Sequence, residues 1–263
     1  MKLFTRLQPM VWSTGMLLFM VAFVACSGAD QADMESAEMS SSETGEGWEV
    51  LFDGESLDGW RGIGREDIPE GHWTIEDGAL RKVATDDVAR LPDGQPAAGG
   101  DLLYDRQFSN FELAFEWKVS PGANSGIKYN VSEELSMTQS NNAALGFEYQ
   151  ILDNELHPDA ANDPNRHAAG LYDLIPPGSN AELSPVGEWN RGRIVFNGNR
   201  GEHWLNGELV VEYELGTHMM NRLLRTSKWE NIPEFGDRRP AGYIVFQDHG
   251  DDVWYRNIRV RGL

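Results

Sequence analysis

The sequence is poor in cysteine, in basic residues and in long apolar segments. Its 263 residues include one cysteine, Cys26, so the chain beyond it can form neither a disulfide framework nor a thiolate metal site. Lys and Arg number 22 against 42 Asp and Glu, which gives a formal net charge of −20. Because this charge repels phosphate backbones, the sequence argues against a nucleic-acid partner.

The longest apolar run lies at the N-terminus. Lys2 and Arg6 precede a mainly apolar stretch at residues 10–25, and Cys26 follows it directly. This order is typical of a bacterial lipoprotein signal peptide, in which the cysteine after the cleavage point receives the lipid. We therefore expect residues 1–26 to be a signal peptide that ends at a lipidated Cys26. The alternatives are a plain cleaved signal and an N-terminal membrane anchor.

Residues 27–47 offer little apolar surface to bury. They contain six acidic residues and no basic residue, together with many Ser, Gly and Ala residues. Burial within such a segment cannot offset the entropy lost when the chain is ordered. The composition predicts a flexible acidic tether between the lipid anchor and one domain at residues 48–263. The expected location is the cell envelope, in the periplasm or attached to the outer membrane.

The rest of the chain lacks convincing helical periodicity. Short apolar or alternating runs are separated by Gly, Asn, Asp and Pro clusters, which predicts an all-β sandwich. Residues 111–119 alternate between apolar and more polar side chains, as a strand with one buried face requires. Asn206-Gly207 predicts a tight two-residue hairpin turn. The expected strands span residues 49–52, 73–76, 79–82, 101–104, 111–119, 125–131, 147–152, 170–173, 191–196, 202–205, 208–213, 242–246 and 253–260.

Two long loops interrupt this pattern. Residues 154–169 are rich in Asp, Asn, Ala and Pro, and we expect His157 and His167 there to be solvated. Residues 216–240 carry several large apolar side chains, and residues 218–225 could form a short helix. A loop of that length and apolarity either covers a sheet edge or forms one wall of a substrate cleft.

The strongest interior candidates for chemistry lie on the strand at 147–152. Glu148 and Gln150 point to the same face of this strand, whose other residues are apolar. A carboxylate on a buried strand needs a partner. Glu148 is therefore either an acid, base or ligand in a cleft, or the partner of a buried Arg or backbone donor.

A second polar pair lies on the strand at 125–131. Lys128 and Asn130 share one face and follow the small residues Ser125 and Gly126. Lys128 either neutralises Glu148 across the sheet or donates to a developing oxyanion.

The C-terminal strands supply further candidates. Gln247 and His249 end a strand face beside Gly250, where a ligand or backbone can approach closely. Arg256, on the return strand, faces the same cleft or holds the turn. Trp189 either stacks on a sugar ring or packs in the core.

An ordered set of motifs resembles the DUF1080 family, also called 3-keto-disaccharide hydrolases. The resemblance extends over residues 47–263 and implies a concanavalin-A-like jelly-roll sandwich of two antiparallel sheets, often carried on bacterial lipoproteins. Asn130 departs from the pattern, because the family commonly has Arg at this position. The motifs are the stretch Trp48 to Trp60, Asn124-Ser125-Gly126-Ile127, Gly146 to Asn154, Glu188-Trp189-Asn190, Trp204-Leu205-Asn206-Gly207, Gln247-Asp248-His249-Gly250 and Tyr255 to Ile258.

The resemblance implies cleavage of 3-keto-glycosides that a separate sugar C3 oxidoreductase has produced. The C3 ketone acidifies the C2 proton, so a base can remove it and the enolate can expel the C1 aglycone. We expect Glu148 or His249 to be the base and Asp153 to be a supporting acid. The expected substrate contacts are Asn124, Lys128, Gln150, Trp189, Gln247 and Arg256.

Three points stay open at this stage. No cofactor is certain, although a divalent ion on Glu148, Asp153 or His249 would stabilise an enolate. Direct hydrolysis by two carboxylates is the rival mechanism, but the strand at 147–152 lacks the central acid that such sites carry. A non-catalytic carbohydrate-binding lipoprotein module is the alternative of a different class.

Overall fold

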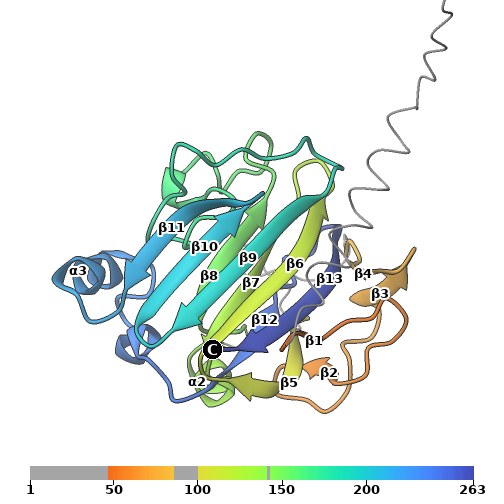
Figure 1. The fold of residues 1–263 in the computed structure, drawn as a ribbon, viewed down its shortest axis with the longest axis horizontal. Coiled ribbons are helices and arrows are strands. Elements are labelled where there is room, and N and C mark those ends of the chain that lie inside the picture. The colour runs from red at the N-terminus through yellow and green to blue at the C-terminus, as the bar shows by residue number, and fades with distance from the viewer. Residues whose placement is uncertain (1–46, 86–99, 141–142) are drawn as a thin grey trace, which may run out of the picture. The chain divides into compact units, whose positions relative to one another are not determined.

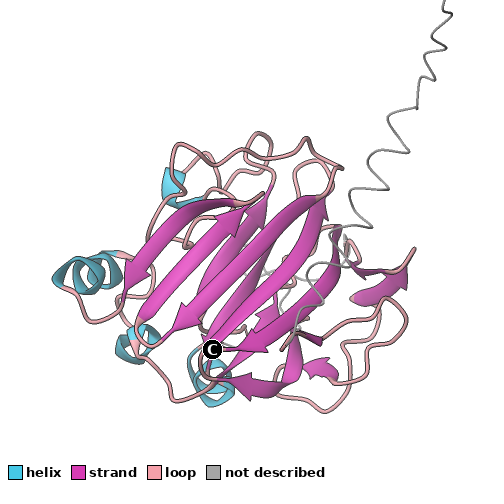
Figure 2. Ribbon diagram, in the orientation of Figure 1, coloured by secondary structure: helices cyan, strands magenta, loops and turns pink. Residues whose placement is uncertain are grey.

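Two antiparallel β-sheets pack face to face in the computed structural model, which describes residues 47–85, 100–140 and 143–263 (Figures 1 and 2). This arrangement confirms the predicted concanavalin-A-like jelly-roll sandwich. The predicted signal peptide, Cys26 and the acidic tether lie outside the described residues, apart from Gly47 at the end of the tether. No helix in the described ranges has the length and apolarity needed to cross a bilayer.

The larger sheet has eight strands within the described residues. Its main order is β11-β10-β9-β6-β13-β4-β3, and β1 pairs with β13. Figure 1 shows β11, β10, β9, β6 and β13 side by side. The bounds are β1 Glu49–Val50, β3 Trp73–Glu76, β4 Ala79–Lys82, β6 Phe111–Val119, β9 Asn190–Asn197, β10 Arg200–Leu205, β11 Glu208–Glu214 and β13 Val253–Gly262.

The smaller sheet has five strands within the same residues, in the order β2-β5-β12-β7-β8. In β7 and β8 the register places Lys128 directly opposite Glu148, and Val245 of β12 lies on the other side of Lys128. The bounds are β2 Trp60–Gly62, β5 Leu102–Phe108, β7 Asn124–Val131, β8 Phe147–Leu152 and β12 Gly242–Phe246.

Side-chain alternation builds the core between the sheets. In β6, Phe111 and Trp117 are each 1% exposed, as the period of two predicts. Tyr129 of β7 and Phe147 of β8 meet them from the smaller sheet in the same apolar cluster. The opposite side of β7 and β8 therefore faces away from the core, and it carries Lys128, Glu148 and Gln150.

Short helices and turns connect the strands. α2 (Glu133–Gln139) begins at Ser132, whose side chain accepts a hydrogen bond from Leu135 N, and this helix was not predicted. α3 (His218–Thr226) confirms the short helix expected in the 216–240 loop. Within the described residues, the other helical turns are η1 (Pro164–Arg166) and η2 (Pro233–Gly236).

Most predicted strands are confirmed, and the Asn206-Gly207 turn joins β10 to β11 with positive φ angles at both residues. The prediction of a strand at residues 170–173 is wrong. Leu171 makes only isolated bridges, and Ala169 and Asp173 have φ angles of 66° and 60°, which no regular strand accommodates. The prediction also missed β2, a three-residue strand too short for alternation to reveal.

Candidate functional site

A polar pocket lies on the outer face of the five-stranded sheet, over β7, β8 and the end of β12. Residues of β7 and β8 that alternate with the core side chains point into it. The loop after β8 and the 216–240 loop supply one residue each. The lining residues are Asn124, Glu148, Gln150, Tyr172, Lys228, Gln247 and His249.

Glu148 is the buried carboxylate of this pocket, with 5% of its surface exposed. Burial raises the pKa of its carboxyl, and the ammonium groups of Lys128 and Lys228 offset this only in part. Space for the carboxylate depends on Gly126, because a Cβ atom there would lie 2.2 Å from Glu148 Oε1. A carboxyl held in this way can accept a proton closer to neutral pH than an exposed one.

Gln247 connects Glu148 to Lys128. With its amide oriented to satisfy both neighbours, its nitrogen donates to Glu148 Oε1 over 3.3 Å and its oxygen accepts from Lys128 Nζ over 3.2 Å. Lys128, for which the sequence left open a pairing with Glu148 or donation to an oxyanion, is thus connected to Glu148 through an amide. Lys128 Nζ also lies 3.6 Å from Asp101 Oδ2.

A second network of buried charges lies beneath the pocket and includes Asp101 and Asp248. Asp101 accepts hydrogen bonds from Asp248 N and Ala144 N, both at 2.8 Å. The Asp248 carboxylate in turn contacts Lys82 Nζ at 2.8 Å and His72 Nδ1 at 2.5 Å. These partners outweigh the effect of burial and lower the pKa of Asp248.

Gly100 makes room for this network, since a Cβ atom there would lie 1.8 Å from Asp248 Oδ2. The network links the β4 strand and the start of β5 to the Gln247–Gly250 turn. Both side chains of the Lys82–Asp248 pair are 0% exposed, so each charge depends on the other for compensation.

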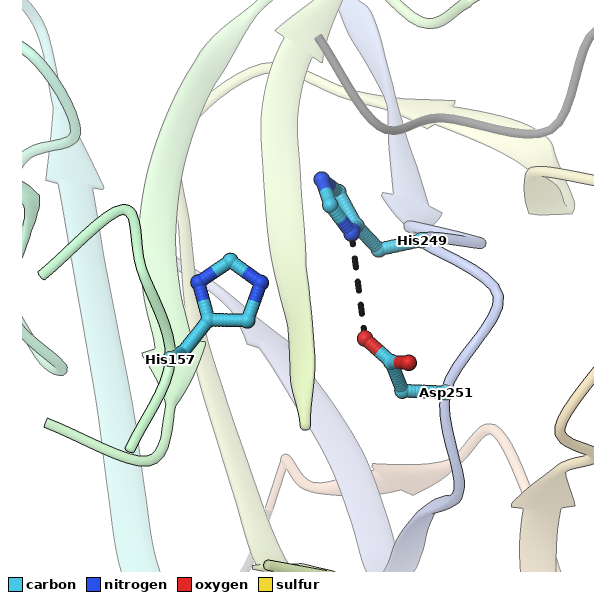
Figure 3. Close-up of side chains that lie close together, drawn as sticks. All are labelled: His157, His249 and Asp251. Carbon is cyan, nitrogen blue, oxygen red and sulfur yellow. Dashed lines mark ion pairs between the residues drawn. The ribbon is translucent and has the colours of Figure 1, made fainter. Parts of the chain in front are cut away.

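His249 lies close to His157 and Asp251 at the edge of the pocket (Figure 3). Its Nδ1 lies 3.8 Å from Asp251 Oδ2, and its ring packs edge-on against His157 with 5.5 Å between ring centroids. One ligand atom from each of the three residues falls within 4.8 Å of the others. His157 is therefore half-buried beside His249 rather than solvated in its loop. Burial and the neighbouring His249 lower its pKa.

Comparisons with known proteins agree with this geometry. Residues 47–261 match the family described as the 3-keto-alpha-glucoside-1,2-lyase-like domain. The chain belongs to this family. The protein named 3-keto-disaccharide hydrolase from Bacteroides thetaiotaomicron is 38% identical over 278 residues, which cover 91% of this chain and 94% of the relative.

Two solved structures are similar to this chain in fold. One crystal structure of a predicted glycosyl hydrolase from Parabacteroides distasonis ATCC 8503 has a TM-score of 0.72 and 26% identity, covering 84% of this chain and 96% of that one. A second from the same strain, with a TM-score of 0.60 and 24% identity, covers 82% and 99% respectively and shares the fold.

The predicted site residues fall into two groups. One group comes together at or beneath the pocket: Asn124, Lys128, Glu148, Gln150, Gln247 and His249. The other group does not line the pocket and consists of Asp153, Trp189 and Arg256. The carboxylate of Asp153 accepts hydrogen bonds from the backbone N–H groups of Gly122, Glu155 and Leu156, so it anchors the turn after β8. These backbone donors outweigh burial and lower the Asp153 pKa.

Trp189 and Arg256 lie on the outer face of the eight-stranded sheet. The guanidinium carbon of Arg256 is 4.1 Å from the centroid of Trp189, and its Nε donates to Glu116 Oε2 over 2.7 Å. The sequence left Arg256 to face the cleft or to hold the turn, and Trp189 to stack on a sugar or to pack in the core. The structure places neither side chain in the pocket. Arg256 pairs with Glu116, the residue opposite it on β6. Trp189 stacks on the Arg256 guanidinium, and both side chains are partly exposed.

Sequence reasoning missed several residues of the site. Tyr172 and Lys228 line the pocket from loops, and Asp101, Asp248 and Lys82 lie beneath it. Lys228 Nζ is 4.6 Å from the ring centroid of Tyr172. The sequence could have indicated Asp248. It is an acid on the core-facing side of an otherwise apolar strand end, and a buried carboxylate there requires a cation as its partner. Loop residues such as Lys228 carry no comparable pattern.

Asn130 anchors the segment that contains Asp237 and Arg239. The Asn130 side chain donates to Asp237 O and accepts from Arg239 N, while the Arg239 guanidinium donates to Asn130 O. The backbone at Asn130 has a φ of 54°, a value that Asn tolerates better than most residues.

Proposed function

We propose that this protein cleaves 3-keto-disaccharides through proton abstraction at C2 and loss of the C1 aglycone. The observation that carries the proposal is Glu148, a buried carboxylate whose pKa is raised and which lies beside Lys128 and Lys228 in the pocket. The name of the B. thetaiotaomicron relative supports the substrate class.

The chemistry requires a base next to cationic groups. A ketone at C3 makes the C2 proton acidic, and its removal leaves an enolate that expels the substituent at C1. Water then adds to the resulting enone, so the overall reaction is a hydrolysis. The charge that develops on the C3 oxygen is stabilised by preorganised hydrogen-bond donors.

The pocket offers residues for both tasks. Glu148 is the preferred base, because burial raises its pKa and leaves it poised to accept a proton; His249 is the second candidate on the same wall. Lys228 and the Gln247–Lys128 pair are placed to stabilise the enolate and to bind sugar hydroxyls. We assign Asp153 to positioning, since backbone donors occupy its carboxylate.

Direct hydrolysis by two carboxylates has less support. That mechanism needs an acid and a second carboxylate on either side of the scissile bond. Among the pocket-lining residues in the described ranges, Glu148 is the single carboxylate. The nearby Asp101 lies beneath Lys128 and accepts two backbone hydrogen bonds.

Incubation of the purified protein with a 3-keto-disaccharide and with its unoxidised parent tests the proposal. We expect release of the aglycone from the 3-keto sugar alone, with exchange of the C2 proton for deuterium in D₂O. Release from neither sugar would instead identify a carbohydrate-binding module. Release from the parent alone would eliminate the C2 mechanism.

The cellular setting is part of the same proposal. Lipidation at Cys26 would hold the domain at the cell envelope, in the periplasm or at the outer membrane, through the acidic segment at 27–47. A separate oxidoreductase that oxidises sugars at C3 would have to supply the substrate. Metabolic labelling with a fatty-acid analogue, compared between the parent and Cys26→Ala, tests the anchor.

A further inference from the structure

We propose that His157, His249 and Asp251 bind one divalent transition-metal ion of the Zn²⁺ class at the edge of the pocket. The site is inferred from ligand geometry and does not depend on turnover. Its use in catalysis rests on the proposed function. The sequence left open a divalent ion on Glu148, Asp153 or His249, and of these three residues the proposed set includes His249 alone.

The spacing of the ligand atoms fits an ion better than direct contact. His249 Nδ1 and Asp251 Oδ2 are 3.8 Å apart, which is longer than a hydrogen bond. Two ligands that each bind Zn²⁺ at about 2.1 Å with a tetrahedral angle are about 3.4 Å apart. All three residues offer a ligand atom within 4.8 Å of the others, so small side-chain rotations complete the set. Figure 3 shows His157 and Asp251 placed around His249.

Backbone contacts hold the ligands in place from outside. Asp251 Oδ2 accepts a hydrogen bond from Asn124 N over 3.1 Å, which ties this ligand to the start of β7. His157 N donates to Asp153 O over 3.0 Å, within the turn that the Asp153 carboxylate organises. Outer contacts of this kind orient metal ligands, and they explain the position of Asp153 outside the pocket.

One contact changes when the ion binds. His157 Nδ1 accepts a hydrogen bond from Asp159 N over 3.1 Å, so Nε2 carries the proton in the neutral ring. Binding through Nε2 moves that proton to Nδ1 and opens the contact with Asp159. We therefore expect weaker binding than at a site whose ligands need no such change, by about tenfold for the loss of one hydrogen bond.

The donor set selects the class of ion and its use. Two imidazoles and one carboxylate favour Zn²⁺, Co²⁺, Mn²⁺ or Fe²⁺ over Mg²⁺ and Ca²⁺. Three protein ligands leave a coordination position open, as catalytic zinc sites do. His249 also lines the Glu148 pocket, so a substrate oxygen there can reach the ion.

Calorimetric titration of chelator-treated protein with Zn²⁺, without any sugar, tests the site. We expect one saturable ion per chain, no competition by Mg²⁺, and visible absorption typical of tetrahedral or five-coordinate Co²⁺. His157→Ala, His249→Ala and Asp251→Asn should each weaken binding at least about tenfold, the range that loss of one ligand or its support produces. Circular dichroism checks that each variant is folded.

Two control variants make the assignment specific. His167→Ala removes a histidine of the same loop whose Nε2 faces Ala160 O, and Glu148→Gln alters the pocket without touching the three ligands. Both should bind Zn²⁺ like the parent. The proposal is overturned by the absence of saturable binding, by binding that survives all three ligand variants, or by loss of binding in Glu148→Gln.

The two proposals fail separately. Zinc binding without turnover of the 3-keto-disaccharide would overturn the proposed function and leave the ion site intact. Turnover by protein that binds no zinc would do the reverse. Turnover that falls on chelation and returns with Zn²⁺ supports both.

Discussion

The outer faces of the two sheets carry similar residue types in different environments. On the eight-stranded sheet, Arg256 and Glu116 form an ion pair whose side chains are 36% and 15% exposed. On the five-stranded sheet, Lys128 and Glu148 are 2% and 5% exposed. Burial raises the pKa of Glu148. The Arg256–Glu116 pair stays in contact with solvent and is an ordinary surface ion pair. Desolvation, rather than residue type, separates the two faces.

The enclosing segments cause this difference. The turn after β12 and the 216–240 loop bring His249 and Lys228 over one sheet. The neighbouring buried pair of Lys82 and Asp248 holds that turn from below. On the other sheet, Arg256 is stacked with Trp189 in a layer that solvent still reaches.

The largest effect should come from Glu148→Gln. If this carboxylate is the base, turnover of a 3-keto-disaccharide falls by about 10²- to 10⁴-fold, the usual contribution of general acid–base catalysis. Glu116→Gln on the other sheet is the matched control and should keep parental turnover. Steady-state kinetics on both variants measures the difference. Full activity in Glu148→Gln would transfer the role of base to His249.

The buried network should dominate stability in the same comparison. Asp248→Asn leaves Lys82 buried without its counterion, and we expect a loss of about 3–5 kcal/mol in the free energy of unfolding. Arg256→Gln breaks an exposed pair and should cost about 0–1 kcal/mol. Urea denaturation of both variants gives the two values. Equal losses would show that the buried pair and the exposed pair do not differ in the way their burial suggests.

The pH dependence of stability should also distinguish Glu148. Its pKa is raised in the folded state, so its contribution to stability is complete below the unfolded pKa and is lost as pH rises through the folded one. Glutamine has no proton to lose. The stability of Glu148→Gln relative to the parent should therefore increase with pH through this window and then level off. Urea melts at a series of pH values test the sign, and a relative decrease would contradict the raised pKa.

The smallest effect should come from Trp189→Ala. Its ring lies against Arg256 and Lys118 away from the pocket, so kcat and KM should match those of the parent. Loss of the cation–π contacts should cost about 0.5–1 kcal/mol of stability. Kinetics and urea denaturation measure the two quantities. An increase in KM alone would restore Trp189 as a sugar-stacking residue.

Local pattern explains which parts of the fold could be predicted. The bounds of β3, β4, β6, β8 and β12 match the prediction, because alternation is written in neighbouring residues. The segment at 170–173 failed because Asp173 adopts a positive φ that its apolar neighbours do not reveal. The short β2 strand depends on pairing with β5, which is a tertiary contact.

The candidate site divides in the same way. Strand period alone placed Glu148 with Gln150 and Lys128 with Asn130. The register that sets Lys128 opposite Glu148 fits one of the two roles that the sequence left open for Lys128. The approach of His157 to His249 could not be foreseen, since 92 positions of chain separate them and no periodic signal links the two loops. Lys228 enters the pocket for a similarly non-local reason.

The sequence by itself determined the all-β class, the faces of the long strands and the family motifs, because these depend on side-chain period and local turn chemistry. The tertiary structure decided which polar residues lose contact with water. Only the folded chain brings Lys82 to Asp248, Gln247 between Lys128 and Glu148, and His157 to His249. Burial and the charges around a group set its pKa, and both are properties of the assembled fold.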